Sequence, residues 1–270
     1  MQEIKRVGGY LEIDKDGFII KQASTERIPE KWKPVIEETV AAYKQHFGDD
    51  LVSVYVRGSV VKGEAIDGIS DLDTIAIVST FKNISTAWGD KFSDESTNKY
   101  PFIEKVEILA GTKEQAIDPK RAVRIMLKIQ AVCVYGKDVS AEIPPLKPNR
   151  ESCQHFTSLQ SELQDTINFF ENAWGTSESE NEKKCAWIMK RILRTGFELV
   201  MECEQKYTRD LYPCYESFTS YYPDKKDSMY RTLEFAINPT GQKEKVLPIL
   251  NEWFNWMPGE IERIFDFKKF

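Results

Sequence analysis

The chain has 270 residues, of which 41% are hydrophobic and 30% are charged. This composition excludes collagen-like and broadly disordered proteins. It is typical of a globular protein, and a length of this order predicts about two domains. The formal net charge of −6 lacks the basic excess of a general nucleic-acid binder, so only a local basic groove would serve a nucleic acid.

The apolar runs, cysteines and histidines of the chain exclude several classes of protein. The longest apolar runs are far shorter than the roughly 18 residues of a membrane span. The N-terminus shows no apolar export signal, so we expect a cytoplasmic protein that does not bind a membrane. Five cysteines, an odd number without CxxC spacing, argue against a disulfide framework and a zinc site. With only two histidines, a Ser-His-Asp hydrolase is also disfavoured.

The first half of the chain alternates between helix and strand patterns. The turn Lys15-Asp16-Gly17 predicts a hairpin between residues 10–14 and 18–22. Apolar residues at helical spacing follow from Pro29 and end before Gly48. Further on, the pattern predicts strands at 51–57, 72–78, 101–110 and 131–135, with a helix at 114–130. The fold class expected here is α/β, a mixed sheet with flanking helices.

The second half is predicted to be entirely helical. Three prolines within residues 142–149 indicate a linker, which separates a first domain (1–145, with the hairpin) from a second domain (150–270). Residues 175–182 are polar and are expected to form a connecting loop. Apolar spacing predicts helices in the regions 156–170, 186–200, 210–222, 226–237 and 243–267, which together would form a helical bundle.

Two short motifs carry the chemistry. Gly58 and Ser59 follow the first strand, where a glycine lets backbone N–H groups approach a phosphate and a serine adds a hydroxyl donor. Asp71 and Asp73 lie two residues apart on the next strand, so both project from one face and could share divalent cations. A neighbouring strand is expected to contribute a third carboxylate.

In this order and spacing, residues 51–136 resemble the DNA polymerase beta-like nucleotidyltransferase superfamily. The resemblance implies that Asp71 and Asp73 hold Mg²⁺ on a nucleoside triphosphate and that a third acidic residue completes the metal site. Glu107 is the expected third residue. Its Val-Glu-Ile context looks like that of the aminoglycoside (streptomycin/spectinomycin) adenylyltransferases, in which a glutamate is the general base. Glu104 is the competitor, but strand parity places it on the opposite face.

The same resemblance extends more weakly to the helical half. It implies that Arg191 and Arg209 contact ATP, although their spacing is longer than in that subgroup, and surface charge is the alternative. Trp174 and the acidic residues of the loop, Glu178, Glu180 and Glu182, would lie where the family contacts its drug. Asn181 stands near an expected carboxylate, which argues against aminoglycoside recognition.

Three further polar residues near the first motif allow two interpretations. Arg57 and Lys62 are either phosphate contacts or solvated charges, and Asp67 is interpreted as a turn residue before Gly68.

These observations favour an adenylyltransferase that moves AMP from ATP to a hydroxyl group, with Mg²⁺ at the paired aspartates. The acidic chain favours a small, hydroxylated, cationic acceptor over a nucleic acid, and Glu198 and Glu202 could provide carboxylates for it. Two alternatives remain open: adenylyl transfer to a protein or RNA acceptor, as in antitoxin-like members, and a nucleotide-binding module without turnover.

Overall fold

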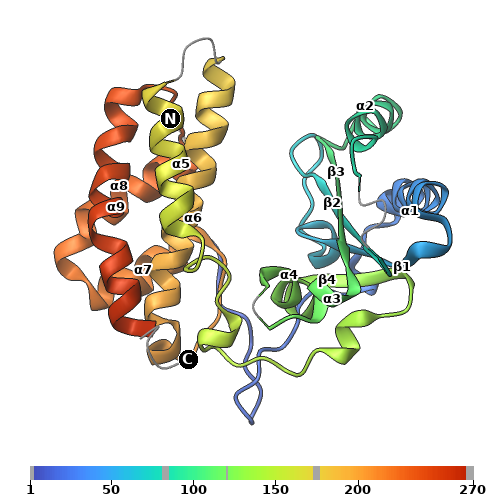
Figure 1. Ribbon diagram of the computed structural model, residues 1–270, viewed down its shortest axis with the longest axis horizontal. Helices are drawn as coiled ribbons and strands as arrows, with labels where there is room; N and C mark the ends of the chain where they lie inside the picture. Colours follow the sequence, from blue (N-terminus) through green and yellow to red (C-terminus); the bar gives the residue numbers. More distant parts are fainter. Residues whose placement is uncertain (1–2, 81–84, 120, 173–176, 266–270) are drawn as a thin grey trace. The chain divides into compact units, whose positions relative to one another are not determined.

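The computed structural model describes residues 3–80, 85–119, 121–172 and 177–265 (Figure 1). By its contacts the chain divides into two compact units. The sheet unit is Phe18–Leu146, and the helical unit combines Met1–Gly17 with Lys147–Phe270.

Within the described residues, the sheet unit contains a mixed four-stranded sheet in the order β3-β2-β1-β4 (Figure 1). β1 pairs antiparallel with both β2 and β4, and β2 pairs parallel with β3. This confirms the expected mixed sheet with flanking helices. The strands are β1 (Leu51–Arg57), β2 (Leu72–Val78), β3 (Val106–Thr112) and β4 (Ala131–Gly136).

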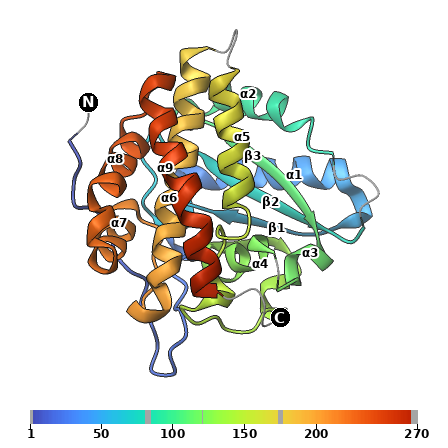
Figure 2. The same cartoon turned by 60° about the vertical axis from the view of Figure 1, so that its left-hand side comes forward.

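Alternating side chains give the sheet two buried faces, each covered by different helices (Figure 2). Val54 and Val56 of β1 pack on the side of α1 (Lys33–Phe47), where Tyr43 is fully buried. Tyr55 lies in the opposite cluster with Ile75, against residues of α3 (Lys113–Ile117) and the segment after it. A side chain that shares the parity of Tyr55 and Ile75 therefore points to the α3 face.

Three segments of the sheet unit differ from the sequence prediction. The strand predicted at 101–110 begins only at Val106. The helix predicted at 114–130 is interrupted near Pro119, which ends α3 because proline lacks an N–H. It resumes as α4 (Ala122–Ile125) and a π-helical turn, Met126–Gln130. A helix that was not predicted, α2 (Gly89–Lys99), has a mostly polar sequence and packs on β3.

The helical unit confirms the expected all-helical second half. Figures 1 and 2 both show α5, α6, α8 and α9 running side by side. Buried apolar residues line their facing sides, among them Phe170, Phe197 and Trp253. The helices are α5 (Leu159–Glu171), α6 (Glu178–Glu204), α7 (Leu211–Tyr221), α8 (Lys226–Ile237) and α9 (Lys243–Phe265).

The turn of the predicted N-terminal hairpin forms, since Gly17 N donates to Asp14 O at 3.0 Å. Both arms also contact other segments. The first arm joins the helical unit, where Leu11 bridges Tyr207. The second arm belongs to the sheet unit, where Ile19 N donates to Leu146 O at 2.8 Å.

The loop predicted at 175–182 is wrong for its described part. Ser177 is the N-cap of α6, and it forms a reciprocal capping box with Glu180. Glu178 and Glu180 therefore belong to the first helical turn, where acidic residues are favoured by the helix dipole. The polar sequence of this segment predicts a loop because the first turn of α6 has no apolar residue.

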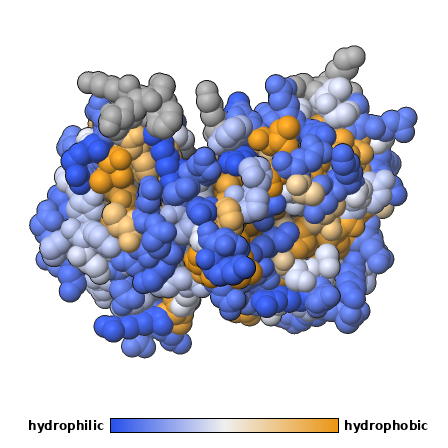
Figure 3. All heavy atoms as spheres, turned by 90° about the horizontal axis from the view of Figure 1, so that it is seen from below, coloured by the Kyte–Doolittle hydropathy of each residue, from blue (hydrophilic) through white to orange (hydrophobic). Residues whose placement is uncertain are grey.

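The surface agrees with the charged composition. Hydrophilic residues cover most of the face in Figure 3, and hydrophobic residues gather in a few patches. Among the described residues, no helix is long and apolar enough to cross a membrane. All five cysteines are free thiols, as expected, and Cys153, Cys185 and Cys214 are buried.

Candidate active site

Three charged side chains form one row across the sheet. Arg57 at the end of β1 is paired with Asp73 of β2, which is paired in turn with Glu107 of β3. All three share the parity of Tyr55 and Ile75, so they project from the α3 face of the sheet. The strand register therefore brings Arg57 together with Glu107, which lies 50 residues away in sequence, and places Asp73 between them.

Arg57 holds the two carboxylates together. Its Nη2 atom lies 2.9 Å from Asp73 Oδ1 and also donates a hydrogen bond to Glu107 Oε2. The side chains of Arg57, Asp73 and Glu107 are 26%, 22% and 34% exposed, so solvent screens these ion pairs only in part. Arg57 is thus not an isolated solvated charge, which was one of the two roles considered from sequence.

The carboxylates repel one another in the absence of a metal. Burial, and then the neighbouring Glu107 carboxylate, raise the pKa of Asp73 to about 7 against the opposing effect of Arg57. The pKa of Asp71 is also raised, first by its partial burial and then by Glu104. Asp71, Asp73 and Glu107 together carry more negative charge than the single Arg57 guanidinium neutralises, which favours binding of a cation.

The donor set fits a hard divalent cation such as Mg²⁺. Carboxylate oxygens are its preferred ligands, and Asp73 and Glu107 present theirs side by side. In the described part of the chain, however, no group of three or more Asp, Glu, His or Cys side chains is arranged as a preformed metal site. The guanidinium group of Arg57 lies between Asp73 and Glu107 and provides there the positive charge that a metal ion would otherwise provide. Asp71 is the exposed residue of the three acids.

The turn after β1 passes directly beside Asp73. Gly58 has φ +81°, and a Cβ atom at this position would lie 2.5 Å from Asp73 Oδ2. Ser59 follows and donates from Oγ to Ser70 Oγ at 3.2 Å, which ties the turn to the residue before Asp71. A single 3₁₀ turn, Val60–Lys62, comes next. The glycine thus allows the backbone to approach the carboxylate closely.

We expect Gly58→Ala to destabilise the fold more than Gly68→Ala. Both glycines have positive φ, +81° and +70°, so both substitutions incur backbone strain of roughly 1 kcal/mol. Only at Gly58 would the new Cβ also collide with Asp73, whereas nothing lies within 4 Å at Gly68. Urea unfolding of both variants measures the difference, and equal losses would show that the close approach to Asp73 has no energetic weight.

The other charges considered near the first motif lie apart from this row. Glu104 is exposed and precedes β3, so Glu107 and not Glu104 is the carboxylate beside Asp73. Lys62 pairs with Glu64 at 3.9 Å. Asp67 lies in an exposed turn and forms an ion pair with Lys31, in agreement with its interpretation as a turn residue.

In the helical unit, the structure brings Arg191 and Arg209 together around one buried histidine. Arg191 Nη1 is hydrogen-bonded to His155 Nδ1, and Arg209 Nη1 lies 3.3 Å from His155 Nε2. A neutral imidazole has only one acceptor nitrogen, so it satisfies only one of these two donors. Burial, and then Arg209, Arg191 and Arg194, hold the pKa of His155 well below its usual range.

The arginine cluster, Arg191, Arg194 and Arg209, carries more positive charge than its neighbours cancel. Arg194 is partly buried, and this burial, followed by the charge of Arg209, lowers its pKa to about 10. Its Nε atom donates to Arg209 O at 3.2 Å, so this arginine contacts another arginine rather than an acid. Glu162 pairs with Arg191 at 3.4 Å. Such a cluster is suited to a polyanion.

Glu198 does not have the role predicted from sequence. Its carboxylate is 8% exposed and accepts backbone N–H groups from three successive residues, Gln154 at 2.6 Å, His155 at 3.1 Å and Phe156 at 3.0 Å. Burial raises its pKa to about 7. The carboxylate therefore holds the His155 segment in place and is not available to a cationic ligand. Glu202 is exposed.

The remaining residues of the predicted acceptor site are only partly described. Trp174 lies outside the described residues. Glu178 is exposed and Glu182 partly exposed on the first turns of α6, and Glu180 is used in the capping box. These residues do not converge with Arg191 or Arg209 through any contact that the structure records.

Sequence reasoning missed the buried polar cluster of His155, Arg194 and Glu198. A signal was present, because Arg191, Arg194 and Glu198 recur at three- and four-residue spacing among the buried apolar residues of α6. Polar residues at helical spacing inside an apolar stripe predict a buried polar network, since each needs a partner there.

No protein-family model and no curated protein matches the chain. Among solved structures, the chain is similar to a spectinomycin adenyltransferase from Enterococcus faecialis, determined with ATP and spectinomycin. The two are 13% identical with a TM-score of 0.47, and the match covers 85% of this chain and 99% of that chain. A likeness of this size assigns no function to the chain.

Proposed function

We propose that the protein is a nucleotidyltransferase that moves AMP from ATP to a hydroxyl group of a small acceptor. The observation that carries the proposal is the row of Arg57, Asp73 and Glu107 beside the Gly58 turn. Asp73 offers a carboxylate for a metal, the Gly58 turn could admit a phosphate, and Glu107 offers a second carboxylate beside Asp73. These are the parts that phosphoryl-group chemistry needs.

The proposed mechanism assigns one task to each side chain. Asp71 and Asp73, with Glu107, would hold Mg²⁺, which when bound neutralises the triphosphate and stabilises the entering and leaving oxygens. Glu107 also accepts the proton of the acceptor hydroxyl. The freed oxygen forms a bond to the α-phosphorus as the bond from that phosphorus to the β-phosphate oxygen breaks, and pyrophosphate leaves. Gly58 and Ser59 bind phosphate through backbone and hydroxyl groups.

Arg57 acts as a positioning residue in this mechanism. By bonding to Asp73 and Glu107 at once, it fixes their separation before the nucleotide arrives. A preorganised carboxylate needs less rearrangement during the reaction. The same contact offsets part of the repulsion that raises the pKa of Asp73.

The arginine cluster of the helical unit is proposed to bind phosphates of ATP. We expect Arg191→Ala and Arg209→Ala each to raise the apparent ATP constant by roughly tenfold or more, because a charge-assisted hydrogen bond contributes about 1.5 to 3 kcal/mol. Steady-state kinetics against ATP concentration measures the change. Arg263→Ala is the control, since that arginine is exposed and pairs only with neighbouring groups. Unchanged ATP constants in folded variants would make the cluster structural.

The acceptor is proposed to be a small, hydroxylated cation. The net charge of −6 and the exposed acids Glu178 and Glu202 support a cationic ligand over a nucleic acid. A screen for Mg²⁺-dependent pyrophosphate release from ATP, across aminoglycosides, tRNA and protein, tests this. Release with tRNA or protein and with none of the small cations would overturn the small-molecule acceptor while retaining the transferase.

A further inference from the structure

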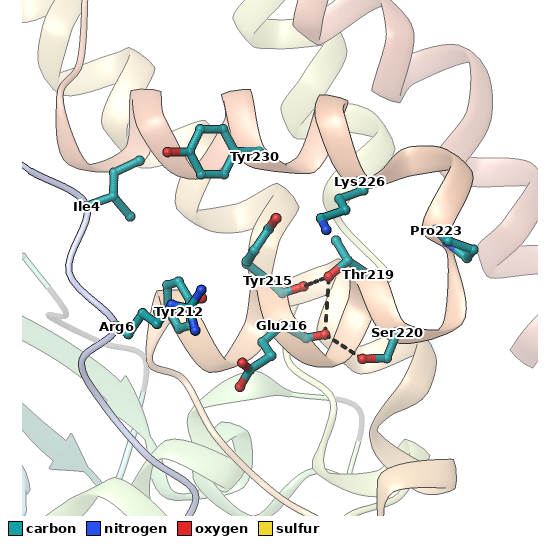
Figure 4. Close-up of a pocket in the computed structure, with 10 residues that line it drawn as sticks. All are labelled: Ile4, Arg6, Tyr212, Tyr215, Glu216, Thr219, Ser220, Pro223, Lys226 and Tyr230. Carbon is teal, nitrogen blue, oxygen red and sulfur yellow. Dashed lines mark hydrogen bonds between the residues drawn. The ribbon is translucent and has the colours of Figure 1, made fainter.

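A pocket of the helical unit, separate from the arginine cluster, lies between the N-terminal segment (residues 4–6) and helices α7 and α8 (Figure 4). Its volume is about 580 Å³, within the range of small-molecule sites. Neither Arg191 nor Arg209 lines it. The proposed nucleotidyl transfer therefore leaves this pocket without a function.

Tyrosine rings form the wall of the pocket. The ring centroids of Tyr212 and Tyr215 are 5.8 Å apart, and those of Tyr215 and Tyr230 are 5.9 Å apart. All three rings line the pocket, and Tyr230 is 45% exposed although its ring is large and apolar. Rings that remain accessible in a concave site are suited to stacking against a planar ligand.

Two cations stand beside these rings. Arg6 lies over the ring of Tyr212, with its guanidinium carbon 5.8 Å from the centroid. Lys226, in the first turn of α8, extends into the pocket beside Tyr215 in Figure 4. Within the described ranges, neither Arg6 nor Lys226 forms an ion pair. Against them the pocket lining has one acid, Glu216, so its net charge is positive.

We propose that this pocket binds a small phosphate monoester that carries an aromatic ring. The tyrosines would stack on the ring, while Arg6 and Lys226 would bind the phosphate, whose charge of about −1.5 to −2 near pH 7 matches two cations. A nucleoside monophosphate and an aryl phosphate share this chemistry. The pocket is large enough for either of them.

Calorimetric titration of the full chain tests the proposal. AMP and phenyl phosphate are the two aromatic phosphates, and adenosine and inorganic phosphate each supply only one half of the ligand. Chelator in the buffer prevents metal-dependent nucleotide binding. We expect at least one aromatic phosphate to bind about tenfold or more tightly than inorganic phosphate and adenosine. Binding of AMP would identify the ligand as a nucleoside monophosphate, and binding of phenyl phosphate alone would identify it as an aryl phosphate.

Variants locate the binding. Lys226→Ala and Tyr230→Ala should each weaken it about tenfold or more, because one removes a phosphate contact and the other a stacking surface. Lys225→Ala is the matched control, since that neighbouring lysine pairs with Glu252 at 3.6 Å and does not line the pocket. Arg191→Ala should also retain binding. Absence of binding by both aromatic phosphates, or equal binding by Lys226→Ala and the wild type, would overturn the proposal.

Discussion

Asp73→Asn is expected to abolish Mg²⁺-dependent nucleotidyl transfer, with turnover reduced by roughly 10³-fold or more. Asparagine keeps the shape of the side chain but removes the negative charge that would hold the metal. Metal stabilisation of the transition state supplies several kcal/mol, and each 1.4 kcal/mol is a factor of ten in rate. Turnover with a working acceptor measures the loss. Asp67→Asn is the matched control, because Asp67 is exposed and pairs only with Lys31.

The same variant gives a test of folding that does not need an acceptor. Burial and Glu107 raise the pKa of Asp73 to about 7, whereas in the unfolded chain this carboxyl titrates near 3.8. A raised carboxyl pKa makes the wild type lose stability as the pH rises from about 4 to 7. Asparagine cannot ionise, so Asp73→Asn should gain stability relative to wild type across this range. Thermal unfolding in chelator at pH 5 and pH 8 measures this gain in stability. A variant less stable than the wild type at both pH values would contradict the prediction.

Glu107→Gln is expected to retain binding of Mg²⁺-ATP through Asp71 and Asp73 but to lose transfer by roughly 10² to 10⁴, the usual contribution of a general base. The amide preserves size and can still accept from Arg57, but it cannot take a proton. Single-turnover kinetics separates binding from the chemical step. Glu104→Gln is the control, because Glu104 is exposed outside the strand. If Glu104→Gln were the inactive variant, the assignment of the base would be wrong.

The core of the sheet unit could be predicted because its signals are local. β1 and β2 have the bounds expected from their β-branched runs. The register of β2 with β3 puts Glu107 beside Asp73, as expected, but strand parity does not apply to Glu104, which precedes β3. The contact of Arg57 with both acids could not be predicted, because it depends on which strands are neighbours in the sheet.

Other parts of the fold depend on tertiary partners that local patterns do not reveal. The N-terminal arms pair with Tyr207 and Leu146, far away in sequence. α2 has a polar sequence and is held by one face, where Ser93 Oγ accepts from Val106 N at 3.0 Å. In the helical unit, the role of Glu198 follows from the three backbone N–H groups of another segment, which turn a predicted ligand contact into a structural one.

The most direct test of the proposed function asks which bond of ATP is broken. Protein, Mg²⁺ and the acceptor panel are incubated with ATP labelled either at the α-phosphate or at the γ-phosphate. Attack at the α-phosphorus predicts that α-label moves to the acceptor while γ-label appears in pyrophosphate, and that both signals vanish in Asp73→Asn. Release of γ-label as inorganic phosphate with ADP, or label transfer that Asp73→Asn leaves unchanged, would contradict nucleotidyl transfer at the row of Arg57, Asp73 and Glu107.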